Sequence, residues 1–276
     1  MLPPYPKSDD SRLIADIKAS SFSVRGIECG RVAASRLLRM SYRMRDRSHV
    51  VPLDAPLPTR QPSPKHQLGN ALMKFFNAPM PAPNPRRVRI FLAEKGVELP
   101  TVEVGIMTGE LKQPEHLARD PLGQLPTLQL DDGSFLSETV AICRYLESLH
   151  PTPPMFGRNA LDTARIDMLT RRVEFQIGTP AGMFWRHAHP FTARVVVPQY
   201  KEFGESNRAH YERGLAWIDN ELNGRDFVAG ADYTIADICL LTMVDFADWI
   251  GLKVPENLTH VRTWHARVSE RPSAKA

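Results

Sequence analysis

The stretch that decides the fold is GQLPTLQLDDGSFLSETVAICRYLE, residues 123–147. Polar and apolar residues alternate over 127–130, DDG follows as a turn, and residues 134–136 resume the extended pattern, which predicts a β-hairpin. Because proline is confined to strand starts, edges and bulges, Pro126 marks the start of the first strand. The backbone of Leu125 would then lack a neighbouring strand and could pair with an extended peptide-like ligand. The alternative is a proline that only begins a strand.

A helix is predicted directly after the hairpin. Ser137 is a suitable N-cap and residues 140–147 have helical periodicity, so Glu138 and Thr139 are expected in the first turn. A helix start offers free N–H groups and partial positive charge to a carboxylate, and Thr139 adds a hydroxyl. The Glu138 carboxylate could hold an ammonium group, so the pattern fits an amino-acid zwitterion. The alternative is that Ser137 and Glu138 only cap the helix.

Composition limits the class of protein. The 276 residues suffice for two domains or one large one, and no apolar run is long enough to span a membrane. Cys29, Cys143 and Cys239 are isolated and show neither metal-ligand spacing nor a CxxC pair. We therefore expect a cytoplasmic protein without a metal site or a membrane partner.

The first 72 residues differ from the rest of the chain. They contain 12 Lys and Arg against 6 Asp and Glu, although the net charge of the whole chain is only +4. Their richness in Pro, Ser and Arg predicts a basic, disordered N-terminal extension over 1–72. We expect this extension to be dispensable and to be translated from a start codon upstream of the true one at Met73. They show no apolar core of a signal peptide. They also lack aromatic residues placed between the basic ones, which would stack on bases, so nucleic-acid binding is not expected.

An α/β domain is predicted over residues 73–150. Asn84 is the expected N-cap of its first helix, with Pro85 at the first helical position and Gly96 closing the helix. Together with the hairpin and its helix, the order is β-α-β-α-β-β-α, and a right-handed crossover followed by an antiparallel hairpin describes a thioredoxin-like domain. The predicted strands and helices ahead of the hairpin lie at residues 73–77, 85–95, 101–106 and 114–119.

An all-helical C-terminal domain is predicted over residues 159–276, after a proline-rich linker at 151–158. Thr234 and Asp237 form a capping-box variant at the head of an apolar helix. Two further apolar helical faces consist of Ile166, Leu169 and Val173, and of Tyr211, Leu215, Ile218 and Leu222.

The segments PLGQLPTL, DDGSFLSETVAICRYLE and YTIADI, in a thioredoxin-like domain followed by a helical one, resemble the cytosolic glutathione transferases of a bacterial, nu-like or related class. The resemblance covers residues 73–276. It implies that Pro126 is cis, that Leu125 pairs with the backbone of the glutathione cysteine, and that Glu138 and Thr139 bind the γ-glutamyl group. It also implies a peptide contact from Gln124 and a bond from Lys112 to the glycine carboxylate.

The resemblance is weaker at the position that activates the glutathione thiol. The family places Tyr, Ser, Cys or Thr after the first strand, whereas NAPMPAPNPRRV has none of these, with Ala82 where a Thr would stand. Asn84 is the candidate catalytic residue, and its alternative role is to cap the helix. A free thiol has a pKa of ~8.5, and lowering it by ~2 units corresponds to ~2.7 kcal/mol. The N–H groups of residues 86–88 and the charges of Arg86 and Arg87 would help, unless these arginines face solvent.

The acceptor pocket is expected between the domains, lined by the loop around Met80 and by the first long helix of the second domain. Met183, Phe184, Trp185 and His187 are expected near it, or else in the core or a dimer surface. The resemblance implies a homodimeric glutathione transferase that adds the thiolate to an apolar electrophile or a peroxide. The alternatives are a glutathione-dependent disulfide or peroxide reductase and a non-catalytic binding protein. Cys143 is expected to pack rather than react.

Overall fold

The structure is a computed structural model that describes residues 73–79 and 81–276. The predicted N-terminal extension and the loop position of Met80 lie outside these residues. All the described residues belong to one unit of the chain. The boundaries predicted at 150 and 158 within this unit stay a prediction.

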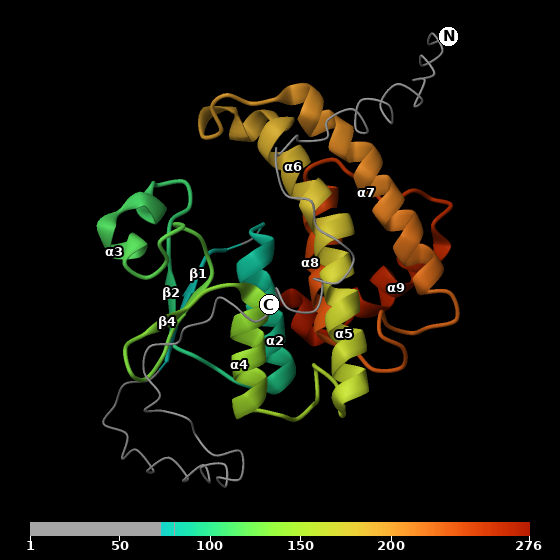
Figure 1. Cartoon of the computed structure of the whole chain (residues 1–276), viewed down its shortest axis with the longest axis horizontal. Coiled ribbons are helices and arrows are strands. Elements are labelled where there is room, and N and C mark those ends of the chain that lie inside the picture. Colours follow the sequence, from blue (N-terminus) through green and yellow to red (C-terminus); the bar gives the residue numbers. More distant parts are fainter. Residues whose placement is uncertain (1–72, 80) are drawn as a thin grey trace, which may run out of the picture. The chain divides into compact units, whose positions relative to one another are not determined.

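A four-stranded mixed sheet forms the first half of the unit, in the order β2-β1-β3-β4. Strand β1 pairs with β2 in parallel and with β3 antiparallel, and β3 and β4 form the predicted hairpin. The thioredoxin-like arrangement is therefore confirmed (Figure 1). The bounds are β1 (Lys74–Asn77), α2 (Pro83–Lys95), β2 (Thr101–Glu103), α3 (Pro114–Leu117), β3 (Thr127–Gln129), β4 (Phe135–Leu136) and α4 (Thr139–Leu149), with a 3-10 turn η2 (Glu110–Lys112).

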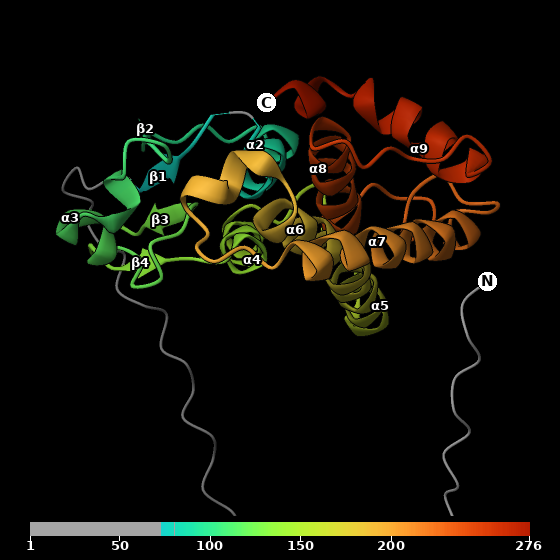
Figure 2. The same ribbon diagram turned by 90° about the horizontal axis from the view of Figure 1, so that it is seen from above.

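Helices α2 and α4 pack against each other on the side of the sheet that faces the helical half, and α3 lies on the opposite side (Figures 1 and 2). Phe75 and Leu128 of the sheet are fully buried with Phe91 of α2 and Ile142 of α4 in one apolar core. The same core continues into the second half because α2 also packs against α8. Helix α2 therefore lies between the two halves, and its first turn opens at their junction.

Both predicted helix starts are one or two residues off. Helix α2 begins at Pro83, with Ala82 as its N-cap, so Asn84 is not the cap. The fixed φ of a proline suits the first helical position, and Pro83 meets that condition two residues before Pro85. Helix α4 begins at Thr139 with Glu138 as N-cap, so Ser137 is not the cap either. Gly96 closes α2 at φ 63°, as predicted.

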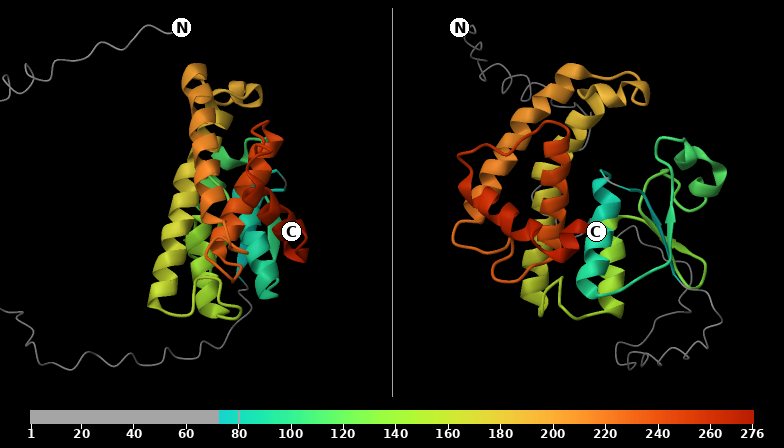
Figure 3. Two further views of the ribbon diagram at one scale, coloured as in Figure 1. Left: turned by 90° about the vertical axis from the view of Figure 1, so that its right-hand side faces the viewer. Right: turned by 180° about the vertical axis from the view of Figure 1, so that it is seen from behind.

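The second half is all helical, as predicted, and its described residues contain one isolated β-bridge but no strand. The capping box of Thr234 and Asp237 is present at the start of an almost wholly buried helix α8. The two predicted apolar faces are buried. The bounds are α5 (Ala160–Val173), α6 (Thr179–His187), α7 (Lys201–Glu221), α8 (Ile235–Trp249) and α9 (Thr259–Ser269), with 3-10 turns η4 (Pro190–Arg194) and η5 (Pro272–Lys275) (Figure 3).

Between α5 and α6 the chain makes a π-helical turn, η3 (Glu174–Gly178). Helix α7 crosses it so closely that a Cβ on Gly214 would lie 2.1 Å from the carbonyl oxygen of Gln176, and only glycine fits there. Such wide turns often occur at functional sites because they redirect side chains within a continuous helix. Here the turn delivers Glu174 and Thr179 to the cavity described below.

None of the described helices has an apolar run of the length needed to cross a bilayer.

Candidate active site

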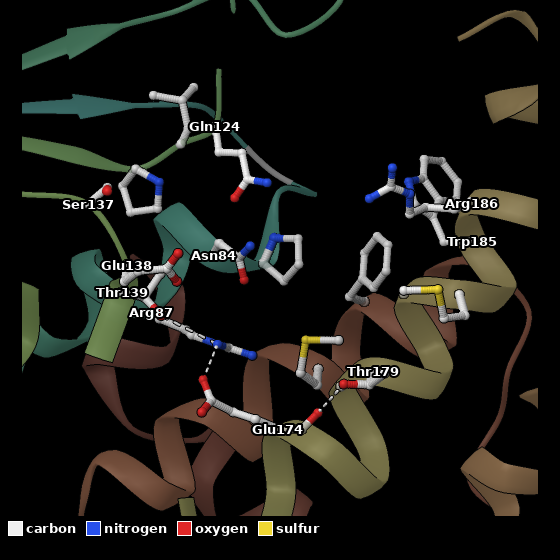
Figure 4. A pocket seen from close by; sticks show the side chains of 18 of the residues that line it. Asn84, Arg87, Gln124, Ser137, Glu138, Thr139, Glu174, Thr179, Trp185 and Arg186 are labelled. Atoms are coloured by element: carbon white, nitrogen blue, oxygen red, sulfur yellow. Dashed lines mark hydrogen bonds and ion pairs between the residues drawn. The ribbon is translucent and has the colours of Figure 1, made fainter. Parts of the chain in front are cut away.

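A cavity of about 480 Å³ opens where the first turns of α2 and α4 meet η3, α6 and α8. Its lining comes from both halves of the unit, with Asn84, Gln124, Glu138 and Thr139 on one side and Trp185 and Arg186 on the other (Figure 4). The volume lies in the range of small-molecule sites. The structure therefore brings together all the predicted glutathione residues except Lys112.

The segment before β3 presents the backbone of Leu125 to this cavity. The ladder with β1 begins at Thr127, and the described part of the chain offers Leu125 no backbone hydrogen-bond partner. Gln124, the residue before Leu125, is held at both its backbone groups. Its N–H donates to Asp120 Oδ2 at 2.6 Å, and the carbonyl oxygen of Gln124 lies 2.9 Å from His116 Nε2. The bond from Leu125 to Pro126 is cis, as the resemblance implied. The backbone of Leu125 is thus fixed in place and free to pair.

At the start of α4, Glu138 adopts φ 66° and ψ 115°, and it is the one described non-glycine residue with a positive φ. A side chain in this region of φ and ψ is strained, and such residues often occur at ligand sites. Here the conformation ends the extended segment and starts the helix at the next residue. As a result, the exposed Glu138 carboxylate and the buried Thr139 hydroxyl both reach the cavity.

A buried arginine lies beneath Thr139. Arg87 Nη1 is 3.4 Å from Thr139 Oγ1 and 3.4 Å from Glu174 Oε1, and Arg87 Nε donates to Thr242 Oγ1 at 3.2 Å (Figure 4). A guanidinium can only donate, so the Thr139 oxygen accepts from below. The hydroxyl hydrogen of Thr139 is therefore left to donate to a ligand oxygen in the cavity.

The neighbouring arginine is buried as well, so the solvent-facing alternative for Arg86 and Arg87 is wrong. Arg86 Nη1 forms an ion pair with Asp245 Oδ2 at 2.5 Å, and Nη2 donates to the carbonyl of Ala274 at 2.7 Å. Burial alone would raise the pKa of Asp245, but the hydrogen bonds from His265 and Arg86 outweigh it and hold that pKa below its usual value. The charge of Arg86 is thus compensated and does not serve as free positive charge near a thiol.

The first turn of α2 offers fewer N–H groups than predicted. Pro83 and Pro85 have none, and the Arg86 N–H donates to the carbonyl of Ala82 at 3.4 Å. Only the N–H of Asn84 is left in this turn. The Asn84 side chain is exposed at the cavity and does not cap the helix, so its amide is available to a ligand. Arg89 fixes the loop ahead of the turn by donating to Asn77 Oδ1 and to the Ala78 carbonyl at 2.7 and 2.8 Å.

Lys112 lies beside the cavity rather than in its wall. It is exposed in η2, and its Nζ would be 3.2 Å from a Cβ placed on Gly123, the residue before Gln124. A flexible lysine at this distance can reach the outer end of an extended ligand that pairs with Leu125. Its role stays a prediction.

The apolar wall differs from the prediction. Met183 and Trp185 of α6 line the cavity together with Met243 and Phe246 of α8, whereas the first long helix, α5, contributes none of the lining residues. Two of the four expected residues lie elsewhere. Phe184 is buried under the guanidinium of Arg208, and His187 packs between Tyr200 and Phe203.

Comparison with known proteins identifies the family. Residues 82–149 match the profile of the glutathione S-transferase N-terminal domain, and residues 184–272 match that of the C-terminal domain. Glutathione S-transferase 2 of Saccharomyces cerevisiae is 36% identical over 206 residues, which cover 74% of this chain and 88% of the yeast protein. The chain belongs to the glutathione S-transferase family. It is an enzyme of that family, and glutathione is the cosubstrate of its relatives.

Solved structures of glutathione transferases have the same fold as this chain. The crystal structure of Gtt2 from S. cerevisiae superimposes with a TM-score of 0.69 at 35% identity and covers 73% of this chain and 98% of that one. A glutathione S-transferase domain-containing protein from Marinobacter aquaeolei superimposes with a TM-score of 0.70 at 31% identity, and the match covers 72% of this chain and 98% of that one. These comparisons support the fold and the family, while the nu-like class stays a prediction.

The two cysteines of the described transferase fold are buried and free, as expected for packing. Burial raises the pKa of Cys143 well above its usual value and that of Cys239 to about 11. Both thiols are therefore neutral at physiological pH, and neither of these two described cysteines supplies a thiolate.

Several lining residues of this glutathione transferase were missed by sequence reasoning: Asp120, Glu174, Thr179, Arg186, Met243 and Phe246. For Asp120 a local signal exists, because a carboxylate four residues before Gln124 can accept its N–H in a turn. The others reach the cavity only through the π-helical turn and the packing of α8, which leave no local pattern in the sequence.

Proposed function

We propose that this transferase binds glutathione in an extended conformation along Leu125 and adds its thiolate to an electrophilic small molecule. The observation that carries the proposal is the meeting, in one cavity, of an unpaired strand-like backbone at Leu125 with the start of helix α4 at Thr139. An extended peptide can add to the first as a strand, while its carboxylate end can dock on the second.

The γ-glutamyl group fits the α4 end of the cavity. Its carboxylate would accept from the Thr139 hydroxyl, which the Arg87 guanidinium leaves as a donor, and from N–H groups at the helix start. Its ammonium group would lie against the Glu138 carboxylate. The cysteine backbone would pair with Leu125, while Gln124 and Lys112 would contact the glycine end.

The thiol would lie near the first turn of α2. Asn84 offers two donors there, its N–H and its side-chain amide. Both stabilise a thiolate more than a thiol and so lower the thiol pKa. With an aryl chloride as acceptor, the sulfur attacks the ring carbon, the C–S bond forms, the C–Cl bond breaks and chloride leaves with the electron pair. The thiol proton passes to solvent.

A second candidate is glutathione-dependent reduction of a disulfide or peroxide. The specific observation in its favour is that residues 77–84 supply no hydroxyl or thiol group to hold the sulfur. In that reaction the thiolate attacks a disulfide or peroxide bond, which breaks and releases a thiolate or an alkoxide. A second glutathione then displaces the thiolate or hydroxide left on the first sulfur, so that glutathione disulfide forms and the substrate is reduced. The family also typically forms homodimers, and we propose the same assembly and a cytoplasmic location for this enzyme.

Parallel assays separate the candidates. We expect conjugation of 1-chloro-2,4-dinitrobenzene to exceed reduction of hydroxyethyl disulfide in kcat/KM, each corrected for the uncatalysed rate. The reverse order would favour the reductase. Tight glutathione binding with neither activity would contradict both and leave a binding protein.

A further inference from the structure

The acceptor side of the cavity carries a positive charge that the proposed reaction with a neutral electrophile does not use. Arg186 of α6 lines the cavity, and in Figure 4 its guanidinium points into the space opposite Gln124. It is exposed, and no acidic side chain in the described ranges forms an ion pair with it. The two other arginines near the cavity, Arg86 and Arg87, are buried against the acids Asp245 and Glu174.

Next to Arg186, a group of aromatic rings leads from the cavity to the surface. We call Trp185, His189, Phe191, Phe246 and Trp249 the aromatic shelf. Trp185 and Phe246 line the cavity with ring centroids 5.6 Å apart, and Trp185 stacks on Phe191 at 5.4 Å. Trp249 lies 5.3 Å from Trp185 and completes the group.

The aromatic shelf is not a closed core. Phe191 is 51% exposed and Trp249 is 50% exposed, although both belong to it. Exposed rings of this kind provide faces on which a flat acceptor can stack. The rings and the guanidinium adjoin through neighbouring residues of one helix, Trp185 and Arg186, so one ligand can contact both.

We infer that Arg186 and the aromatic shelf select aromatic electrophiles that carry a negative charge, such as a ring carboxylate. This inference rests on the proposed function and names its substrate class. A planar acceptor would stack on the shelf near Trp185 and Phe246, and its carboxylate would pair with the Arg186 guanidinium, which forms two parallel hydrogen bonds with such a group. Arg186 is thus a specificity-determining residue, and it takes no part in bond formation.

A matched pair of substrates tests the inference. 4-Chloro-3,5-dinitrobenzoate and its methyl ester share the reacting carbon and differ by one charge, so each kcat/KM is compared after division by the uncatalysed rate constant. We expect Arg186→Gln to lower the acid-to-ester ratio by up to about fivefold, the effect of losing an exposed ion pair. Arg186→Lys should restore most of the ratio, and raising the salt concentration should reduce the ratio in the wild type and in Arg186→Lys but not in Arg186→Gln.

Arg194→Gln is the matched control, because Arg194 is an exposed arginine of η4 outside the cavity. The Arg194→Gln variant should have the same acid-to-ester ratio as the wild type. If Arg186→Gln leaves the acid-to-ester ratio unchanged, whether both kcat/KM values fall equally or neither falls, the inference is overturned. A weaker affinity for glutathione itself in Arg186→Gln would also overturn it, since the guanidinium would then hold the glycine carboxylate.

The binding of the two reaction products keeps the inference testable without turnover. The glutathione conjugates of the acid and of the ester can be titrated against the fluorescence of Trp185 and Trp249, and the wild type should bind the acid conjugate about fivefold more tightly. If glutathione binds but the conjugates bind equally, the inference fails alone. If glutathione does not bind, the proposed function fails with it.

Discussion

The sharpest test of the proposed site replaces Thr139 by valine. The side chain is buried at 7% exposure, and valine keeps its branched shape while it removes the hydroxyl. Arg87 loses an acceptor at 3.4 Å but retains Thr242 and Glu174, so its charge is not left alone. The first turn of α4 is otherwise unchanged. The loss is therefore confined to one donor directed into the cavity.

The magnitude follows from the charge of the group that Thr139 would bind. A hydrogen bond to a charged group contributes about 1.5–3 kcal/mol, so we expect the Kd for glutathione to rise about 10- to 150-fold. Calorimetric titration measures it. The matched ligand is γ-aminobutyryl-cysteinyl-glycine, which lacks only the α-carboxylate of the γ-glutamyl group. The wild type should prefer glutathione over this analogue, and Thr139→Val should remove most of the preference.

Thr139→Ser is the control, because it keeps the hydroxyl and should keep the preference. The reasoning is refuted if Thr139→Val weakens both ligands equally, since the residue would then act only through the fold. It is also refuted if neither affinity changes. A wild type that binds both ligands alike would show that the γ-glutamyl carboxylate lies elsewhere.

Three further changes probe the thiol contact and the scaffold. Asn84→Ala should raise the thiol pKa of bound glutathione by about one unit, since one neutral hydrogen bond is lost, and ultraviolet titration of the thiolate measures it. Gly214→Ala should lower the thermal midpoint by several degrees because its Cβ would lie 2.1 Å from the Gln176 carbonyl oxygen, whereas Gly182→Ala, with no atom within 4 Å, should not. Burial raises the pKa of Asp237 from 3.8 to about 6, so the folded state holds a proton that the unfolded state releases, and the free energy of unfolding should fall by about 2 kcal/mol as pH rises from 4 to 6. Asp237→Asn should lack this slope in denaturant titrations.

Several elements of both halves were predictable because each depends on a local pattern. The hairpin follows from alternation around DDG, and the capping box at Thr234 follows from residues three apart. The start of α2 was not predictable, because prolines at positions 81, 83 and 85 each suit a helix start. The structure selects Pro83, and this choice decides that Asn84 is free rather than a cap.

The burial of Arg86 and Arg87 next to the cavity could not be predicted from the sequence, for a different reason. Arg86 and Arg87 look like solvent-facing residues at a helix start, yet their partners Asp245 and Thr242 are more than 150 residues away in sequence. Only the packing of α2 on α8 brings them together. A buried arginine is indistinguishable from an exposed one until the acids and hydroxyls that surround it are known.

The same contacts limit how strongly the thiol can be activated. The prolines remove N–H groups from the first turn of α2, and Asp245 compensates Arg86, so the two donors of Asn84 are the principal ones left for the sulfur in the proposed complex. Two neutral hydrogen bonds of about 1 kcal/mol each correspond to about 1.5 pKa units, which is less than the two units that the sequence led us to expect. An enzyme with a weakly activated thiolate depends more on holding the electrophile in line with the sulfur. The aromatic shelf and Arg186 lie where that orientation would be imposed, so we expect the rate to respond to the shape and charge of the acceptor more than to its intrinsic reactivity.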